Sequence, residues 1–302
     1  MLFDKIIKRE LGHSFKCLRG DIMKKPIVAL IYDFDKTLCT RDMQEYGFIP
    51  KINMKSSEFW KEVKDLTDSE EMDNILAYMY KMVDKARENK ISIKKEDFNK
   101  LGKGVEFFSE VESWFDRINK YGNSKGVRIE HYIVSSGIKE IIEGTSIAKY
   151  FKKIYACEFM YDYTNSIIWP KFAINYTAKT QFLFRINKGV LKIDSSSAEK
   201  LNNFTPENQR RIPFRNMIYI GDGLTDVPCM KLVNSNGGKS IAVYNEENGK
   251  TSAELLLKHK RVNFIAPADY GINSEIEQIV KAIIKKVQAV SELDEYIPKV
   301  DN

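Results

Sequence analysis

Two patterns of hydrophobic and polar positions alternate along this chain. Short apolar runs rich in β-branched and aromatic residues are typical of buried strands, and they cover residues 27–32, 127–134, 153–158, 217–220, 240–244 and 262–266. Apolar residues spaced by three and four positions are typical of amphipathic helices, and they occur over residues 58–66, 70–88, 104–121, 179–190, 252–259 and 274–293. A short helix over residues 145–151 and a hairpin over 159–169 complete the pattern. Strands and helices that alternate in this way predict an α/β protein.

One segment departs from this alternation. Residues 41–103, directly after the first strand, have a helical pattern throughout. They carry 13 Lys/Arg and 13 Asp/Glu, so the insertion has no net formal charge and cannot attract a highly anionic substrate by charge alone. Residues 1–25 precede the first strand, and a short amphipathic helix and an extension with little contact to the core fit their sequence equally well.

The composition is that of an ordinary soluble protein. At 302 residues, with 43% hydrophobic and 30% charged residues, the chain can bury a full core without disulfides. Its four cysteines include no CxxC pair, which favours free thiols in a reducing cytoplasm. We find no secretory signal and no apolar run of about 20 residues, so we expect a cytoplasmic protein without membrane partners. The net charge of +6 is spread thinly, and we expect no specific nucleic-acid partner.

The first strand ends in a cluster of polar residues. Its apolar run is followed by the string DFDKT, which begins with Asp33 and Asp35 and ends with Thr37. Ligands of open α/β sheets bind beyond the carboxyl ends of the strands, where these two acids are expected to lie. If Asp33 attacks an electrophile, Asp35 can pass a proton to and from the leaving oxygen. A polar turn with a helix-capping Asp or Thr is the structural alternative.

Two later segments place polar groups next to a strand and a helix. The strand over residues 127–134 ends in Ser135, Ser136 and Gly137, where a hydroxyl and nearby backbone N–H groups can hold a phosphate oxygen. Lys179 stands in the first turn of a predicted helix, where a cation opposes the helix dipole and therefore suggests a function. A capping serine and a solvated surface lysine are the structural alternatives.

The most informative later motif is the string GDGLTD at residues 221–226, directly after the strand over 217–220. Glycines on both sides of Asp222 allow a tight turn, and Asp222 and Asp226 offer hard oxygen ligands suited to Mg²⁺. An acidic turn that caps a helix is the structural alternative, but it leaves unexplained why both acids follow a buried strand. The three histidines of the chain are scattered and form no metal-ligand set.

Together these motifs resemble those of one family. The DxDxT string at residues 33–37, Ser135, Lys179 and the GDGxxD string occur in the order typical of the haloacid-dehalogenase-like (HAD) hydrolases. The VSSG and GDGLTD strings are most similar to the phosphoserine-phosphatase-like branch of that family. The resemblance implies a doubly wound, mostly parallel, Rossmann-like sheet with a small α-helical cap. It divides the chain into an N-terminal extension of residues 1–25, a catalytic core of residues 26–40 and 104–302, and a cap of residues 41–103.

The resemblance also implies a mechanism for a phosphatase that acts on a small phosphorylated substrate. The implied catalytic residues are Asp33, which forms an aspartyl-phosphate, Asp35, which acts as acid and base, and Lys179. Binding of the substrate phosphate is implied for Thr37, Ser135, Ser136 and Lys179. Ligation or support of Mg²⁺ is implied for Asp33, Asp35 through its backbone carbonyl, Asp222 and Asp226.

Several alternatives stay open on the sequence. A phosphotransferase to an acceptor alcohol, a phosphatase acting on nucleic-acid ends and a non-catalytic phosphate-binding protein are each compatible with parts of the pattern. Dehalogenation is disfavoured, because a halide leaves without a proton and Asp35 would then have no role. The oligomeric state and the identity of the phosphomonoester are not predicted.

Overall fold

The computed structural model describes residues 25–245, 249–294 and 296–297, and the predicted extension over residues 1–25 lies almost wholly outside them. The described residues contain one seven-stranded sheet in the order β4-β3-β2-β1-β5-β6-β7. Its strands are β1 (Ile27–Tyr32), β2 (Arg128–Ile138), β3 (Phe151–Tyr161), β4 (Ile167–Phe172), β5 (Met217–Gly221), β6 (Lys239–Tyr244) and β7 (Phe264–Pro267). Neighbouring strands are parallel except for β3 and β4, which are antiparallel. The predicted, mostly parallel sheet is therefore confirmed.

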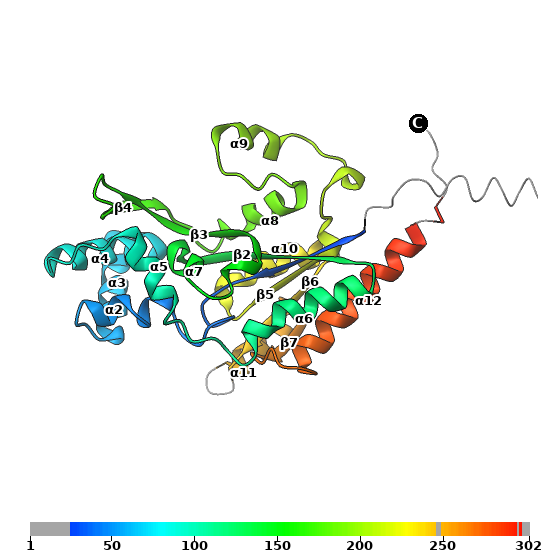
Figure 1. The fold of residues 1–302 in the computed structure, drawn as a ribbon, viewed down its shortest axis with the longest axis horizontal. Helices are drawn as coiled ribbons and strands as arrows, with labels where there is room; N and C mark the ends of the chain where they lie inside the picture. The colour runs from blue at the N-terminus through cyan, green and yellow to red at the C-terminus, as the bar shows by residue number, and fades with distance from the viewer. Residues whose placement is uncertain (1–24, 246–248, 295, 298–302) are drawn as a thin grey trace, which may run out of the picture.

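Helices cover both faces of the sheet (Figure 1). Those that follow residue 103 are α6 (Val111–Ser124), α7 (Lys139–Glu143), α8 (Lys179–Lys188), α9 (Ser195–Asn202), α10 (Val227–Ser235), α11 (Lys250–Lys258) and α12 (Glu275–Asp294). On one face α6 packs against α12, and on the other α8 packs against α10. Strands β1 and β5 are consequently buried along almost their whole length, as their continuous apolar runs require. The fold is thus the predicted doubly wound one.

Residues 41–103, which we call the cap segment, are helical. They contain the 3₁₀ helix Met43–Glu45 and the α-helices α2 (Phe48–Lys51), α3 (Ser56–Glu70), α4 (Asn74–Glu88) and α5 (Lys95–Gly102). These helices gather beyond the carboxyl end of β1, at one end of the molecule (Figure 1). The backbone N–H of Thr40 donates to the Glu106 carbonyl at 3.0 Å, and that of Phe108 donates to the Leu38 carbonyl at 3.0 Å. The cap segment therefore leaves the sheet and returns to it at one place.

The boundary predicted for the helix over residues 70–88 is wrong at its start. Helix α4 begins at Asn74, because the Asp73 carboxylate accepts hydrogen bonds from the N–H groups of Ile75 and Leu76 at 3.0 and 3.1 Å and so caps the helix. The preceding helix, α3, ends at Glu70, and residues 71–73 form the break between the two helices. A continuous helical stripe in the sequence cannot reveal this break, since the apolar spacing continues across it.

Other boundaries also differ from the prediction. The helix predicted over residues 104–121 begins at Val111, because the residues before it form backbone hydrogen bonds to the segment after β1. Strand β2 extends beyond residue 134 to Ile138, with irregular pairing over its last residues. Only the three-residue 3₁₀ helix Ala148–Tyr150 forms within residues 145–151. The predicted hairpin is confirmed as β3 and β4.

No helix in the described part of the chain is both long and apolar enough to cross a membrane.

Candidate active site

Two neighbouring strands bring acids to the same edge of the sheet. Strand β1 lies between β2 and β5, so the connections from these central strands diverge to opposite sides. Such a switch point leaves a crevice at the carboxyl ends of the strands. Asp33 directly follows β1 and Asp222 directly follows β5. The Asp33 N–H donates to the Ile220 carbonyl at 2.9 Å, which holds the two strand ends together.

Lys179 places a buried cation between two of the acids. Its Nζ donates to Asp33 Oδ2 and to Asp226 Oδ1, both at 2.8 Å, and its side chain is only 1% exposed. Burial by itself lowers the pKa of Lys179, but the carboxylates of Asp226 and Asp33 outweigh burial and raise that pKa. The amine therefore stays protonated. Tyr219 also donates to Asp226 Oδ1, at 2.7 Å. Ion pairs thus stabilise a lysine that the dipole of α8 disfavours.

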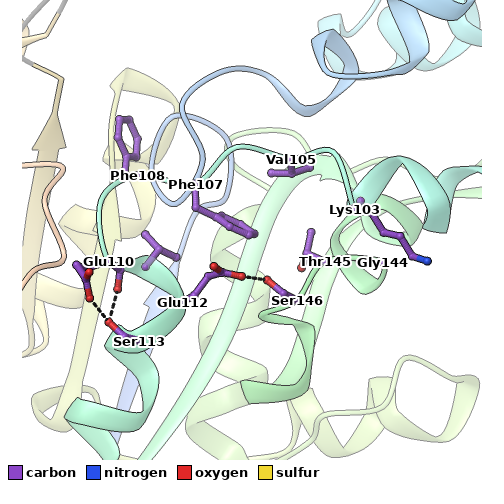
Figure 2. A pocket seen from close by; sticks show the side chains of 12 residues that line it. Lys103, Val105, Phe107, Phe108, Glu110, Glu112, Ser113, Gly144, Thr145 and Ser146 are labelled. Carbon is purple, nitrogen blue, oxygen red and sulfur yellow. Dashed lines mark hydrogen bonds between the residues drawn. The ribbon is translucent and has the colours of Figure 1, made fainter.

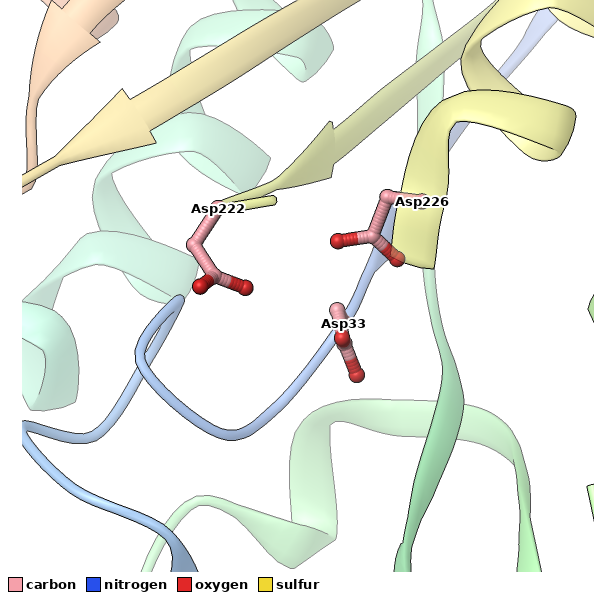
Figure 3. A group of neighbouring side chains, drawn as sticks. All are labelled: Asp33, Asp222 and Asp226. Atoms are coloured by element: carbon pink, nitrogen blue, oxygen red, sulfur yellow. The ribbon is translucent and has the colours of Figure 1, made fainter. Parts of the chain in front are cut away.

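Three carboxylates form a cluster that fits a divalent cation. Asp33, Asp222 and Asp226 each offer one oxygen, and these atoms all lie within 4.8 Å of one another (Figure 3). Burial and then the neighbouring Asp226 carboxylate raise the pKa of Asp33 to about 6 and that of Asp222 to about 8. Asp226 Oδ2 is buried and has no hydrogen-bond partner among the residues that the structure describes. A hard cation such as Mg²⁺ would offset this repulsion and satisfy the oxygens.

Asp35 lies outside that cluster, in the turn after β1. Lys36 next to it has a φ of 55°, and Asp35 Oδ1 accepts a hydrogen bond from the Met43 N–H at 2.8 Å. A Cβ on Gly137 would lie 2.9 Å from Asp35 Oδ2, so the glycine leaves room for the carboxyl group. Burial and then the nearby Asp42 carboxylate raise the pKa of Asp35 well above its ordinary value. This carboxyl group is therefore suited to carry a proton.

The three predicted hydroxyl residues occupy different positions. Ser135 is buried, and its Oγ accepts a hydrogen bond from the Gly137 N–H at 3.0 Å. The Ser136 hydroxyl donates to the Ile174 carbonyl at 2.7 Å. Thr37 is fully buried and donates to Asp222 Oδ1 at 3.5 Å. The structure thus places Thr37 behind Asp222, where it contacts a candidate metal ligand.

A cavity of about 300 Å³ opens over these groups. The predicted residues that line it are Asp33, Asp35, Ser135, Ser136, Lys179 and Asp222. The predicted residues Thr37 and Asp226 are not part of its wall, and they reach the site through their contacts with Asp222 and Lys179. The structure therefore joins all the predicted residues into one site, in two layers.

The residues that close the cavity from the side of the cap segment were not predicted from the sequence. They are Asp42, Gln44 in the 3₁₀ helix, Trp60 in α3, and Asn74, Ile75 and Tyr78 in α4. The helical stripe over residues 70–88 includes Ile75 and shows that this side chain points inward. No signal in the sequence separates cavity residues from core residues on such a stripe, because both are turned away from solvent.

A larger cavity lies elsewhere, between the end of α5 and the start of α6 (Figure 2). It measures about 750 Å³ and contains none of the predicted site residues. Four of its polar side chains pair with one another: Ser146 donates to Glu112, and Ser113 donates to Glu110. Size alone therefore does not identify the active site, which is the smaller cavity that contains the acids and the buried lysine.

Comparison with known proteins agrees with this geometry. The family model described as haloacid dehalogenase-like hydrolase matches residues 30–231. An uncharacterized protein of Borreliella burgdorferi (strain ATCC 35210 / DSM 4680 / CIP 102532 / B31) is 33% identical over 277 residues, which cover 82% of this chain and 93% of the relative.

Solved structures share the fold at low sequence identity. A HAD family hydrolase from Salmonella enterica subsp. enterica serovar Typhi has 16% identity and a TM-score of 0.52, and the match covers 81% of this chain and 68% of that one. A substrate-bound phosphoserine phosphatase complex has 12% identity and a TM-score of 0.53, with 86% and 99% covered. The motifs, the fold and the family match lead to one conclusion: this chain belongs to the haloacid dehalogenase-like hydrolase family.

Proposed function

We propose that this chain hydrolyses phosphomonoesters through a phosphorylated aspartate, with Mg²⁺ as cofactor. The observation that carries the proposal is the position of Asp33. Its carboxylate lines the cavity, lies 2.8 Å from Lys179 Nζ, and belongs to one cluster with Asp222 and Asp226. A nucleophile, a buried cation and hard metal ligands therefore meet at one side chain. A phospho-aspartyl intermediate analogue of phosphoserine phosphatase, with a TM-score of 0.52 and 13% identity, shares the fold and supports this reaction class.

In the first step an Asp33 oxygen attacks phosphorus, and the bond between phosphorus and the ester oxygen breaks. The leaving alkoxide takes the proton of Asp35, whose raised pKa keeps a proton available. This step releases the alcohol and leaves the phosphoryl group on Asp33. The site thereby replaces one difficult displacement by water with two easier steps.

In the second step a water molecule attacks the phosphorus of phosphorylated Asp33. Asp35, now a carboxylate, takes the proton of that water, and the bond between Asp33 and phosphorus breaks. Inorganic phosphate leaves, and both carboxyl groups return to their starting states. Asp35 is suited to both roles because Met43 holds its Oδ1 at 2.8 Å and its position is therefore fixed.

The remaining residues bind charge. Lys179 offsets the charge of Asp33 and of the phosphate oxygens, and Ser135 and Ser136 line the part of the cavity where these oxygens would lie. When bound, Mg²⁺ reduces the repulsion between the anionic nucleophile and the anionic phosphate. Asp33, Asp222 and the backbone carbonyl of Asp35 would hold it, with support from Asp226. The cap segment covers the cavity, limits the access of water and selects the substrate.

Hydrolysis of p-nitrophenyl phosphate tests the proposal. We expect turnover that is lost after treatment with EDTA and is restored by added Mg²⁺. Phosphate binding without turnover under all of these conditions would favour a non-catalytic phosphate-binding protein. Turnover that EDTA does not change would contradict the metal dependence and leave the hydrolase assignment standing.

A further inference from the structure

The wall that the cap segment contributes to the catalytic cavity has one charged side chain, Asp42, whose carboxylate is paired with Lys36. Its other residues are uncharged: Gln44, Trp60, Asn74, Ile75 and Tyr78. The indole N–H of Trp60 donates to Glu45 Oε1 at 2.9 Å, so the ring presents carbon atoms to the cavity. A substrate whose phosphate lies at Asp33 would place its alcohol portion against these uncharged residues.

The charged groups of the cavity leave no cation for a second anion. Among the described residues that line it, the two cationic side chains are Lys36 and Lys179. Lys36 Nζ lies 2.7 Å from Asp42 Oδ2, and Lys179 Nζ lies 2.8 Å from Asp33 Oδ2. A carboxylate on the substrate would therefore lie among the carboxylates of the site without a partner of opposite charge, which is unfavourable in a buried space.

Gln44 provides a buried acceptor in the wall of this cavity. It is 2% exposed, lines the cavity, and has an Oε1 atom without a hydrogen-bond partner among the described residues. The preceding residue, Met43, donates its N–H to Asp35, the proposed proton donor to the leaving oxygen. Gln44 and the proposed proton donor Asp35 therefore line one cavity and are linked through Met43.

The neighbours of Gln44 determine which end of its amide is free. The Tyr78 hydroxyl donates to the Ser136 carbonyl at 2.6 Å, so it can only accept from the Gln44 side chain that lies against it. The NH₂ group of Gln44 consequently faces Tyr78. Its carbonyl oxygen has no donor in the described part of the chain, and a buried acceptor without a donor is unfavourable.

We propose that the substrate is the phosphate monoester of a small, uncharged alcohol that carries a further hydroxyl group, which donates to Gln44 Oε1. This inference rests on the proposed phosphatase function and specifies its substrate class. A phosphorylated amino acid or hydroxy acid is disfavoured, because its carboxylate would have no cationic partner in the cavity.

A matched pair of substrates tests the charge argument on the unmodified protein. Glycerol 3-phosphate and 3-phosphoglycerate have the same three-carbon chain and differ by a hydroxymethyl group against a carboxylate. We expect kcat/KM for glycerol 3-phosphate to be at least about tenfold higher. An equal or higher kcat/KM for 3-phosphoglycerate would overturn the inference. Absence of turnover with p-nitrophenyl phosphate as well would overturn the proposed function, so the two failures are distinguishable.

The variant Gln44→Leu tests the acceptor. The p-nitrophenyl group has no hydrogen-bond donor, so the ratio of kcat/KM for glycerol 3-phosphate to that for p-nitrophenyl phosphate reports the Gln44 interaction. We expect this ratio to fall about tenfold in Gln44→Leu. Gln288→Leu on α12 is the matched control and should leave the ratio unchanged. A ratio that is the same in Gln44→Leu and in the unmodified protein would overturn the assignment of Gln44.

Discussion

Replacing Asp33 by Asn tests the proposed nucleophile and the energetics of the buried acids in one variant. An amide has almost the volume of a carboxylate, but it cannot form the aspartyl-phosphate. We therefore expect turnover of p-nitrophenyl phosphate to fall by at least about 10³-fold, as for other essential nucleophiles. The fold should persist, because Lys179 keeps its second partner, Asp226, at 2.8 Å.

The same change should stabilise the metal-free protein at pH 7.5. Burial and Asp226 raise the pKa of Asp33 from 3.8 to about 6. Because the pKa is higher in the folded state, this group's contribution to stability is complete below about pH 4 and is lost as the pH rises through about 6. A difference of about two pKa units corresponds to about 3 kcal/mol. The uncharged Asn avoids this loss of stability. For a chain of this length, the gain corresponds to a rise in Tm of roughly 5 °C.

Thermal unfolding in EDTA measures this effect. Asp33→Asn should unfold at a higher temperature than the unmodified protein at pH 7.5, and the difference should be about half as large at pH 5. Asp65→Asn, on the exposed surface of α3, is the matched control and should change neither turnover nor Tm. A lower Tm for Asp33→Asn at pH 7.5 would show that the protein needs the carboxylate as a partner of Lys179, and the burial argument would be refuted. Turnover near that of the unmodified protein would refute the nucleophile.

Two further variants separate the roles of the remaining groups. Asp35→Asn should slow the breakdown of the aspartyl-phosphate by about 10²-fold or more while Mg²⁺ affinity changes little. Rapid-quench kinetics with p-nitrophenyl phosphate should then show a burst of p-nitrophenol. Parallel losses of Mg²⁺ affinity and turnover would contradict the role of Asp35 as acid and base. Lys179→Met leaves Asp33 and Asp226 buried without their cation, so we expect turnover to fall by at least about 10²-fold and the free energy of unfolding by about 3–5 kcal/mol. Urea denaturation measures the second effect, and unchanged stability would show that the two ion pairs contribute nothing.

The sequence was sufficient where function is encoded in adjacent residues. The apolar run of β1 ends at Tyr32, directly before Asp33, and the strand before the GDGLTD string ends one residue before Asp222. A strand and the turn that follows it are local features, so hydrophobic pattern and residue type predict both. The misplaced charge of Lys179 at the start of α8 was similarly visible, because the helix dipole acts within the first turn.

The tertiary structure decided how these local features meet. The two-layer site, in which Asp226 supports Lys179 and Thr37 supports Asp222, depends on β1 and β5 being neighbours in the sheet. The position of Gln44 in the cavity depends on how the cap segment packs over the strand ends. Hydrophobic spacing shows that a side chain is buried, and it does not show which distant element covers it. For this chain, the sequence determined which groups can perform the chemistry, whereas long-range packing determined which of them share a cavity and what kind of substrate fits between them.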